Sequence, residues 1–103
     1  MSASAYSPYN CYSWVEYRVG DLPSMQTLLN TATMRTPVQG DVAVFKYDKP
    51  CLDGLSYCPH VASIEYVFDD GSWWQYECNY NKGECGFRHL TPSYGSLVGF
   101  YTP

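Results

Sequence analysis

Four residues of this sequence have the chemistry of a nucleophile, a proton carrier and an orienting group. Cys11 stands alone, far from the other four cysteines, and His60 is followed along the chain by two polar candidates, Glu77 and Asn79. A thiolate can attack an amide carbonyl, a histidine can pass a proton to the leaving amine, and a carboxylate or amide can hold the imidazole ring. The residue types therefore predict amide-bond cleavage, with Glu77 and Asn79 both open as the orienting residue.

The thiol of Cys11 stands where a lowered pKa is expected. Residues 11–19 are predicted to form an amphipathic helix, because Val15 and Val19 lie four residues apart with Cys11 on the same face, and Trp14 follows Cys11 by three residues. Cys11 then begins the helix. Unpaired N–H groups at a helix N-terminus favour the thiolate over the thiol.

After a second expected helix over residues 23–33, the hydrophobic period changes to that of strands. Four short segments are rich in branched and aromatic residues and bounded by Gly, Pro, Asp or Asn: residues 41–47, 60–68, 72–80 and 96–101. Helices first and strands afterwards predict an α+β domain, with the N-terminal helices packed on a mostly antiparallel β-sheet.

The register of one hairpin decides whether the histidine meets its partners. The segment "VFDDGSW" carries an Asp-Gly turn signal between the second and third expected strands. With a loop of residues 68–71, His60 lies opposite Asn79, and Glu77 lies one diagonal step away on the same face. A loop one residue shorter or longer would turn Glu77 and Asn79 to the other face, so the predicted site depends on this register.

The remaining cysteines form two equally spaced pairs, Cys51 with Cys58 and Cys78 with Cys85. They can close two short disulfide loops, cross-pair or remain thiols, and the sequence leaves these alternatives open. Zinc ranks lower because its motifs usually have tighter spacing, so no metal site is expected. Disulfides in these places would stiffen the loops that carry His60 and Glu77.

Composition and charge limit the partners. The 103 residues suffice for one domain over 1–103 with a modest core, and a hydrophobic content of 46% excludes a disordered chain. The net charge is −4 and the six cationic side chains are scattered, so nucleic acid is not an expected partner. No apolar run could cross a bilayer, and the first ten residues lack the features of a signal peptide. Neither membrane insertion nor a cleaved leader is expected.

Four ordered blocks carry a resemblance to a known family: "NCYSWVEY", "GDVAVFKY", "HVASIEYV" and "YECNY". Together they resemble the CHAP domain, the cysteine, histidine-dependent amidohydrolase/peptidase group of the papain-like NlpC-type superfamily, over nearly the whole chain. The resemblance implies a papain-like fold with Cys11 as the nucleophile, His60 as the base and later acid, and Glu77 as the orienting residue. Asn79 matches an additional polar position of the family.

The resemblance also implies a function and a setting. It predicts hydrolysis of bacterial peptidoglycan by a cysteine (thiol) peptidase or N-acetylmuramoyl-L-alanine amidase, without a cofactor, as in bacteriophage endolysins and virion-associated lysins. Partners would be peptidoglycan and phage virion or tail proteins, and the protein would be a monomer made in the cytoplasm and delivered to the wall or periplasm. The alternatives are a noncatalytic virion or cell-wall module, an interbacterial amidase toxin, and a binding protein with structural cysteines.

Two further residues are candidates for contact with the substrate. Family members usually have Gln before the nucleophile, where its amide helps to hold the oxyanion; Asn10 stands there, one methylene shorter. The adjacent Trp73 and Trp74 should point to opposite faces of a strand, so one fills the core and the other, taken as Trp74, is a platform for sugar rings or peptide stems. Some relatives bind calcium before the cysteine, but residues 1–10 contain no acidic side chain, so none is expected here.

Overall fold

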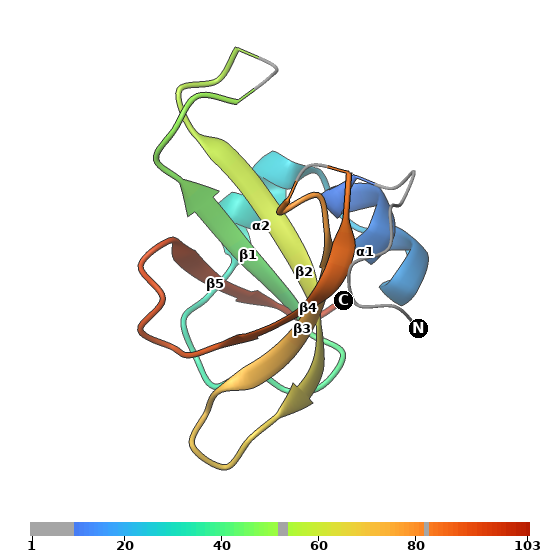
Figure 1. Ribbon diagram of the computed structural model, residues 1–103, viewed down its shortest axis with the longest axis vertical. Coiled ribbons are helices and arrows are strands. Elements are labelled where there is room, and N and C mark those ends of the chain that lie inside the picture. Colours follow the sequence, from blue (N-terminus) through green and yellow to red (C-terminus); the bar gives the residue numbers. More distant parts are fainter. Residues whose placement is uncertain (1–9, 52–53, 82) are drawn as a thin grey trace.

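The computed structural model describes residues 10–51, 54–81 and 83–103, which form two helices and five strands (Figure 1). In chain order these are α1 (Cys11–Val19), α2 (Met25–Thr31), β1 (Val42–Tyr47), β2 (Cys58–Val67), β3 (Trp73–Cys78), β4 (Cys85–Leu90) and β5 (Leu97–Tyr101). The strands make one antiparallel sheet in the order β4-β3-β2-β1-β5. The expected α+β class is confirmed. The expectations for the N-terminal segment, no leader and no calcium site, fall almost entirely on residues outside those described.

Both helices begin at a capping side chain. The side-chain oxygen Oδ1 of Asn10 accepts a hydrogen bond from the Ser13 backbone N–H at 2.7 Å, and the Asn10 backbone N–H donates to the Ser13 hydroxyl at 3.0 Å. The helix expected over residues 11–19 is therefore present with the same bounds. Ser24 caps α2, which is shorter than expected because Ala32 is already extended. No helix among the described residues is long and apolar enough to cross a membrane.

The sheet separates two apolar clusters. Both helices pack on one face, where the buried residues are Val15, Leu28, Val42, Val44 and Val61. The other face holds Ala43, Phe45, Ala62, Ile64, Trp73, Leu90 and Phe100. The rings of Trp73 on β3 and Phe100 on β5 are 5.1 Å apart although two strands lie between them. Because neighbouring strands are about 4.8 Å apart, the sheet must curl around this second cluster, as Figure 1 shows.

Strand β4 is the element that the sequence pattern did not indicate. Along it, the apolar Phe87 is exposed while the charged Arg88 is partly buried, the reverse of an amphipathic strand. As an edge strand paired with β3, it needs no continuous apolar face. The other four strands overlap the four predicted segments.

A buried carboxylate anchors the entry to β1. Asp41 is fully buried and accepts hydrogen bonds from the Arg35 guanidinium at 2.7 Å, the Val38 N–H at 2.9 Å and the Thr102 hydroxyl at 2.8 Å. Burial by itself raises the pKa of this carboxyl, but these hydrogen bonds and the Arg35 charge outweigh burial and hold the pKa below its usual value. The C-terminal end of the chain is thereby tied to the start of the sheet.

Replacing Asp41 with asparagine is expected to lower the free energy of unfolding at neutral pH by about 2 kcal/mol, the typical contribution of a hydrogen bond to a charged group. Because the folded pKa is depressed, the contribution is present above the unfolded pKa and is lost as pH falls through the folded pKa. Urea titrations at decreasing pH measure it, with the exposed Asp48→Asn variant as the control. A difference between wild type and Asp41→Asn that does not shrink in acid would contradict an ionic role.

Candidate active site

Cys11 is the first residue of α1 and, within the described residues, the free cysteine. Burial raises the pKa of its thiol, but the hydrogen bond and positive charge of His60 and the backbone N–H groups of Val61 and Tyr12 outweigh burial. The pKa therefore lies below its ordinary value of 9.0. This is the setting of a reactive thiolate rather than of an inert core cysteine.

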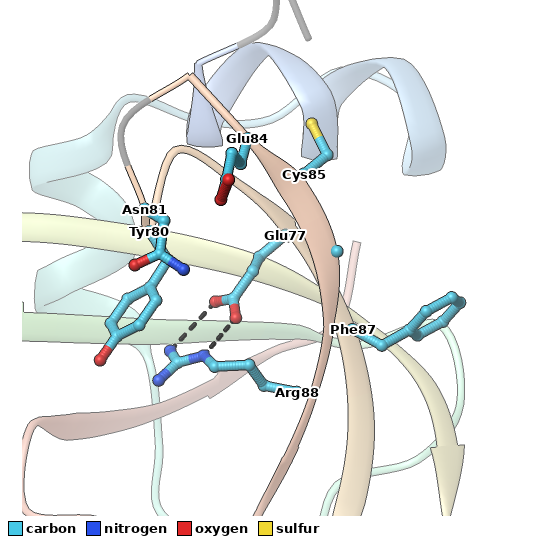
Figure 2. Close-up of a pocket in the computed structure, with 8 residues that line it drawn as sticks. Glu77, Tyr80, Asn81, Glu84, Cys85, Phe87 and Arg88 are labelled. Atoms are coloured by element: carbon cyan, nitrogen blue, oxygen red, sulfur yellow. Dashed lines mark hydrogen bonds and ion pairs between the residues drawn. The ribbon is translucent and has the colours of Figure 1, made fainter. Parts of the chain in front are cut away.

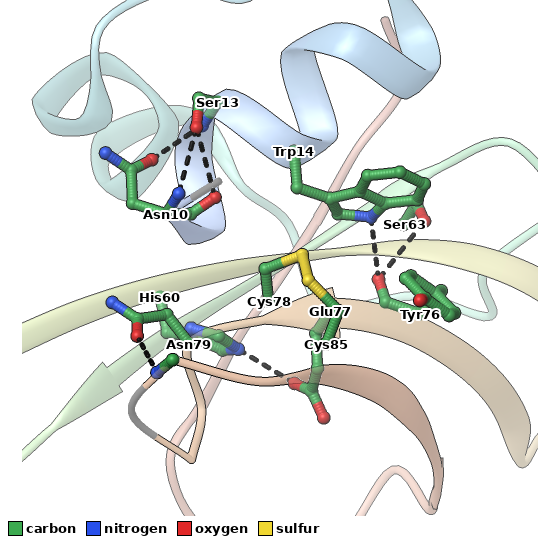
Figure 3. Close-up of a disulfide and its surroundings, with 11 residues drawn as sticks. Asn10, Ser13, Trp14, His60, Ser63, Tyr76, Glu77, Cys78, Asn79 and Cys85 are labelled. Carbon is green, nitrogen blue, oxygen red and sulfur yellow. Dashed lines mark hydrogen bonds and ion pairs between the residues drawn. A yellow bond between two sulfur atoms is a disulfide. The ribbon is translucent and has the colours of Figure 1, made fainter. Parts of the chain in front are cut away.

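His60 joins the thiol to a carboxylate. It lies on β2, only 5% exposed, and its Nε2 is 2.8 Å from Oε1 of Glu77 (Figure 3). Since Nε2 is occupied, Nδ1 is the ring nitrogen left for Cys11. Burial lowers the pKa of the imidazole, but the hydrogen bonds and charges of Cys11 and Glu77 outweigh burial and raise it to about 9. The arrangement favours a thiolate beside an imidazolium.

Glu77 is held by four N–H donors, although only 3% of it is exposed. Its Oε1 accepts from His60 Nε2 and Gln75 Nε2, each at 2.8 Å. The two bonds from Arg88 are drawn in Figure 2: Nη2 donates to Oε1 at 3.1 Å, and Nε donates to Oε2. Burial raises the pKa of this carboxyl, but the bonds and charges of His60 and Arg88 outweigh burial and lower it. Glu77 is thus an ionised carboxylate that fixes the ring of His60.

Asn79 occupies a different place. It lies just beyond the end of β3 in a left-handed conformation with φ 66°, and its side-chain oxygen accepts from the Gly83 N–H at 2.8 Å. That bond holds the turn between β3 and β4. Of the two candidates left open by the sequence, Glu77 is therefore the one hydrogen-bonded to His60, and Asn79 lines the groove beside Cys11.

A β-bulge restores the register that brings His60 to Glu77. The hairpin loop comprises residues 69–71, one residue shorter than expected. By itself, that loop would turn Glu77 to the other face of β3. The ladder, however, shifts between Ile64 and Tyr66, where β2 carries one extra residue. The two changes cancel, and the pairing beyond the bulge is the predicted one.

A groove with about 620 Å³ of space runs past the thiol of Cys11. Its walls come from the start of α1, from α2, from the loop before β2 and from the turn after β3: Asn10, Cys11, Tyr12, Met25, Lys49, Pro50, Cys51, Cys58, Asn79 and Tyr80. The oxygen of the Asn10 side chain is taken by the helix cap, so its amide –NH₂ is the group left to face a ligand. An extended substrate could reach the sulfur here.

Trp74 lies elsewhere. Trp73 is fully buried and Trp74 is 40% exposed, which confirms that they point to opposite faces of β3. Because Trp74 and Glu77 are three positions apart on β3, an odd number, their side chains also point to opposite faces. Trp74 lines a second open groove with Tyr66 and Phe87, and none of these residues lines the groove at Cys11. The structure does not bring Trp74 to the candidate site.

The other cysteines form two local disulfides, Cys51–Cys58 and Cys78–Cys85. Of the alternatives left open by the sequence, the structure has the two short disulfide loops. Cross-paired disulfides, free thiols and zinc ligation are each incompatible with these two bonds. Cys58 precedes His60 by two residues on β2, and Cys78 directly follows Glu77 on β3. Figure 3 shows the second disulfide beside Trp14 of α1. Each disulfide therefore braces the strand that carries a site residue.

Sequence reasoning missed two residues of this site. Gln75 donates to Glu77 and accepts from Trp73 Nε1 at 2.9 Å, so Trp73, Gln75 and Glu77 form a chain along one face of β3. The two-residue period of a strand was a usable signal for Gln75. Arg88 had no such signal, because β4 was not expected to be a strand.

No family model, no curated protein and no solved structure matches this chain. The function must therefore be inferred from the chemistry of the site. A thiol whose pKa is lowered by a histidine, together with an ionised carboxylate hydrogen-bonded to that histidine, can perform nucleophilic acyl transfer.

Proposed function

We propose that the protein is a cysteine amidohydrolase or peptidase of the CHAP type, on a papain-like fold, that cleaves amide bonds of bacterial peptidoglycan. One observation carries the proposal: Cys11 begins α1 with a thiol pKa that His60 lowers, and Nε2 of that histidine is 2.8 Å from the buried carboxylate of Glu77. The ordered sequence blocks around these residues support the peptidoglycan substrate. Phage delivery and virion partners belong to the same proposal.

In the first half of the reaction, the Cys11 thiolate attacks the carbonyl carbon of the scissile amide. The oxyanion that forms is stabilised by the Cys11 backbone N–H and by the side-chain –NH₂ of Asn10. His60 donates its proton to the leaving amine, and the C–N bond breaks to leave a thioester on Cys11.

In the second half, neutral His60 takes a proton from water, and the resulting hydroxide attacks the thioester carbonyl. The C–S bond breaks, the carboxylic acid product leaves, and the thiolate–imidazolium pair is restored. Glu77 stays ionised and keeps one orientation of the ring throughout.

A noncatalytic module on the same scaffold is less well supported. Burying an ionised carboxylate costs several kcal/mol unless partners compensate it, and a protein without turnover has no need of this trio. The intact set of Cys11, His60 and Glu77 therefore favours catalysis. A toxin would use the same chemistry and would differ in how it is delivered.

The proposal is tested by incubating the purified protein with peptidoglycan of several cross-link types, with and without reductant. Loss of turbidity and mass spectrometry of soluble products are the readouts, with Cys11→Ala as the blank. Stem peptides freed from glycan would identify an amidase, and cleaved stems or bridges an endopeptidase. A folded protein that releases nothing from any of these substrates would overturn the proposal.

A further inference from the structure

Arg88 on β4 is the second cationic partner of Glu77. Its Nε donates to Oε2, and its Nη2 donates to Oε1 at 3.1 Å, so both oxygens of the carboxylate are engaged by one guanidinium (Figure 2). Such a forked pair fixes the plane of the carboxylate as well as its charge. Oε1, the oxygen that pairs with His60 Nε2, is therefore also fixed in place by the Arg88 guanidinium.

Three tyrosines hold the guanidinium itself. Its carbon lies 3.5 Å from the centre of the Tyr80 ring, Nη2 donates to the Tyr47 hydroxyl at 3.2 Å, and Nη1 donates to the Tyr94 hydroxyl at 3.3 Å. Tyr80 also lines the groove at Cys11, so its ring stands between the substrate groove and the ion pair. Arg88 is thus a positioned group, unlike a surface arginine with free rotamers.

The reaction cycle makes a second cation useful. While His60 is an imidazolium, Glu77 has two cationic partners; once His60 gives its proton to the leaving amine, one of them is neutral. A carboxylate that is 3% exposed would then favour protonation by burial alone. The permanent charge of Arg88 remains, and it keeps the proton from moving to Glu77.

We propose that Arg88 is a positioning residue of the active site, which keeps Glu77 ionised and aimed at His60 in every step of the cycle. This inference rests on the proposed function. The titratable groups facing the carboxylate are His60 from β2 and Arg88 from β4, with Tyr47, Tyr80 and Tyr94 around the guanidinium and Cys11 beyond the imidazole. Glu84, just before β4, lines the same pocket as Glu77 and Arg88 (Figure 2).

The kinetic test compares Arg88→Met and Arg88→Lys with Arg18→Met, which removes a surface arginine from its ion pair with Glu65. Arg88→Met is expected to lower kcat about 10- to 100-fold with little change in KM. The acid limb of its pH profile, set by the Cys11 thiol, should move to higher pH: Glu77 becomes easier to protonate, and a neutral Glu77 no longer supports the imidazolium that lowers the Cys11 pKa. The kcat of Arg88→Lys should lie between those of Arg88→Met and the wild type, since lysine restores the charge but cannot donate to both oxygens of Glu77 as the guanidinium does. The kcat of Arg18→Met should match that of the wild type.

A double variant separates positioning from folding. If Arg88 acts through Glu77, then Arg88→Met should lower kcat less than about 3-fold further when Glu77 is already glutamine. An equal loss in both backgrounds, or an acid limb that does not move, would overturn the inference. Thermal melts of every variant identify those that lose activity by unfolding, and Arg88→Lys serves if Arg88→Met does not fold.

A measurement without turnover distinguishes this inference from the proposed function. NMR titration of isotope-labelled glutamate carboxyl carbons reports the pKa of Glu77 directly. That pKa should rise in Arg88→Lys and further in Arg88→Met, and stay unchanged in Arg18→Met. An unchanged Glu77 pKa in the Arg88 variants would overturn the role of Arg88 even if the wild type hydrolyses peptidoglycan. A raised Glu77 pKa in those variants, with no hydrolysis by the wild type, would instead overturn the proposed function.

Discussion

Replacing Cys11 with alanine is expected to abolish release of peptidoglycan fragments, with a loss in kcat of roughly 10⁵-fold or more. Alanine has no nucleophilic atom, so the thioester cannot form, and only binding and oxyanion stabilisation remain. The fold should survive, because the cap of α1 is made by Asn10 and Ser13 and not by the sulfur. Product mass spectrometry and a thermal melt check the two halves of this prediction.

Trapping the intermediate makes the same prediction more specific. Intact-mass analysis of protein quenched during turnover should show an acyl adduct on the wild type, mapped to Cys11, and none on Cys11→Ala. Cys11→Ser should fold equally well and be strongly impaired, because a hydroxyl has no comparable anionic form here. Fragments released by Cys11→Ala at the wild-type rate would show that another group, or another protein, does the chemistry.

Replacing His60 with alanine is expected to lower kcat by about 10³-fold, within the usual range for loss of a general acid and base. The pKa of the Cys11 thiol should also rise, because burial raises it and the opposing interaction with His60 is gone. Alkylation by iodoacetamide at a series of pH values measures this: the thiol of the variant should react only at more alkaline pH than that of the wild type.

The second histidine is a matched control. His89 is exposed on β4, and its Nε2 is 2.9 Å from the Ser72 hydroxyl. His89→Ala should leave both the hydrolysis rate and the alkylation profile of Cys11 unchanged. Identical alkylation profiles for the wild type and His60→Ala would contradict the thiolate–imidazolium pair.

The same pair sets the pH range of the wild type. Activity requires a deprotonated thiol and a protonated imidazole, so it should rise through the lowered pKa of Cys11 and fall as pH passes through about 9, where His60 loses its proton. The alkaline limit should move to lower pH in Glu77→Gln, because the amide no longer stabilises the imidazolium by its charge.

The hairpin between β2 and β3 shows how a prediction can be right for an incomplete reason. The Asp-Gly signal indicated the turn, and the predicted register, in which the side chains of His60 and Glu77 lie on the same face of the sheet, is the observed one. Yet the loop is a residue shorter, and the bulge between Ile64 and Tyr66 compensates for it. Turn signals are local, whereas a bulge depends on how both strands pack in the curled sheet.

The sequence by itself determined the features that local interactions control. Apolar residues at helical spacing place Cys11 at the first position of α1, and alternation along β3 places Trp73 inward and Trp74 outward. These features depend on neighbours within a few residues, so spacing and residue type suffice to predict them.

Only the tertiary structure decided the features that join distant segments. The choice of Glu77 over Asn79 for His60, the local disulfide pairing and the separation of Trp74 from the groove all follow from how strands meet in space. Arg88 is the clearest case: its strand has no amphipathic signal, because it is an edge strand whose inward charge is balanced by Glu77 of β3. Such a residue is recognisable only once its partner carboxylate is beside it.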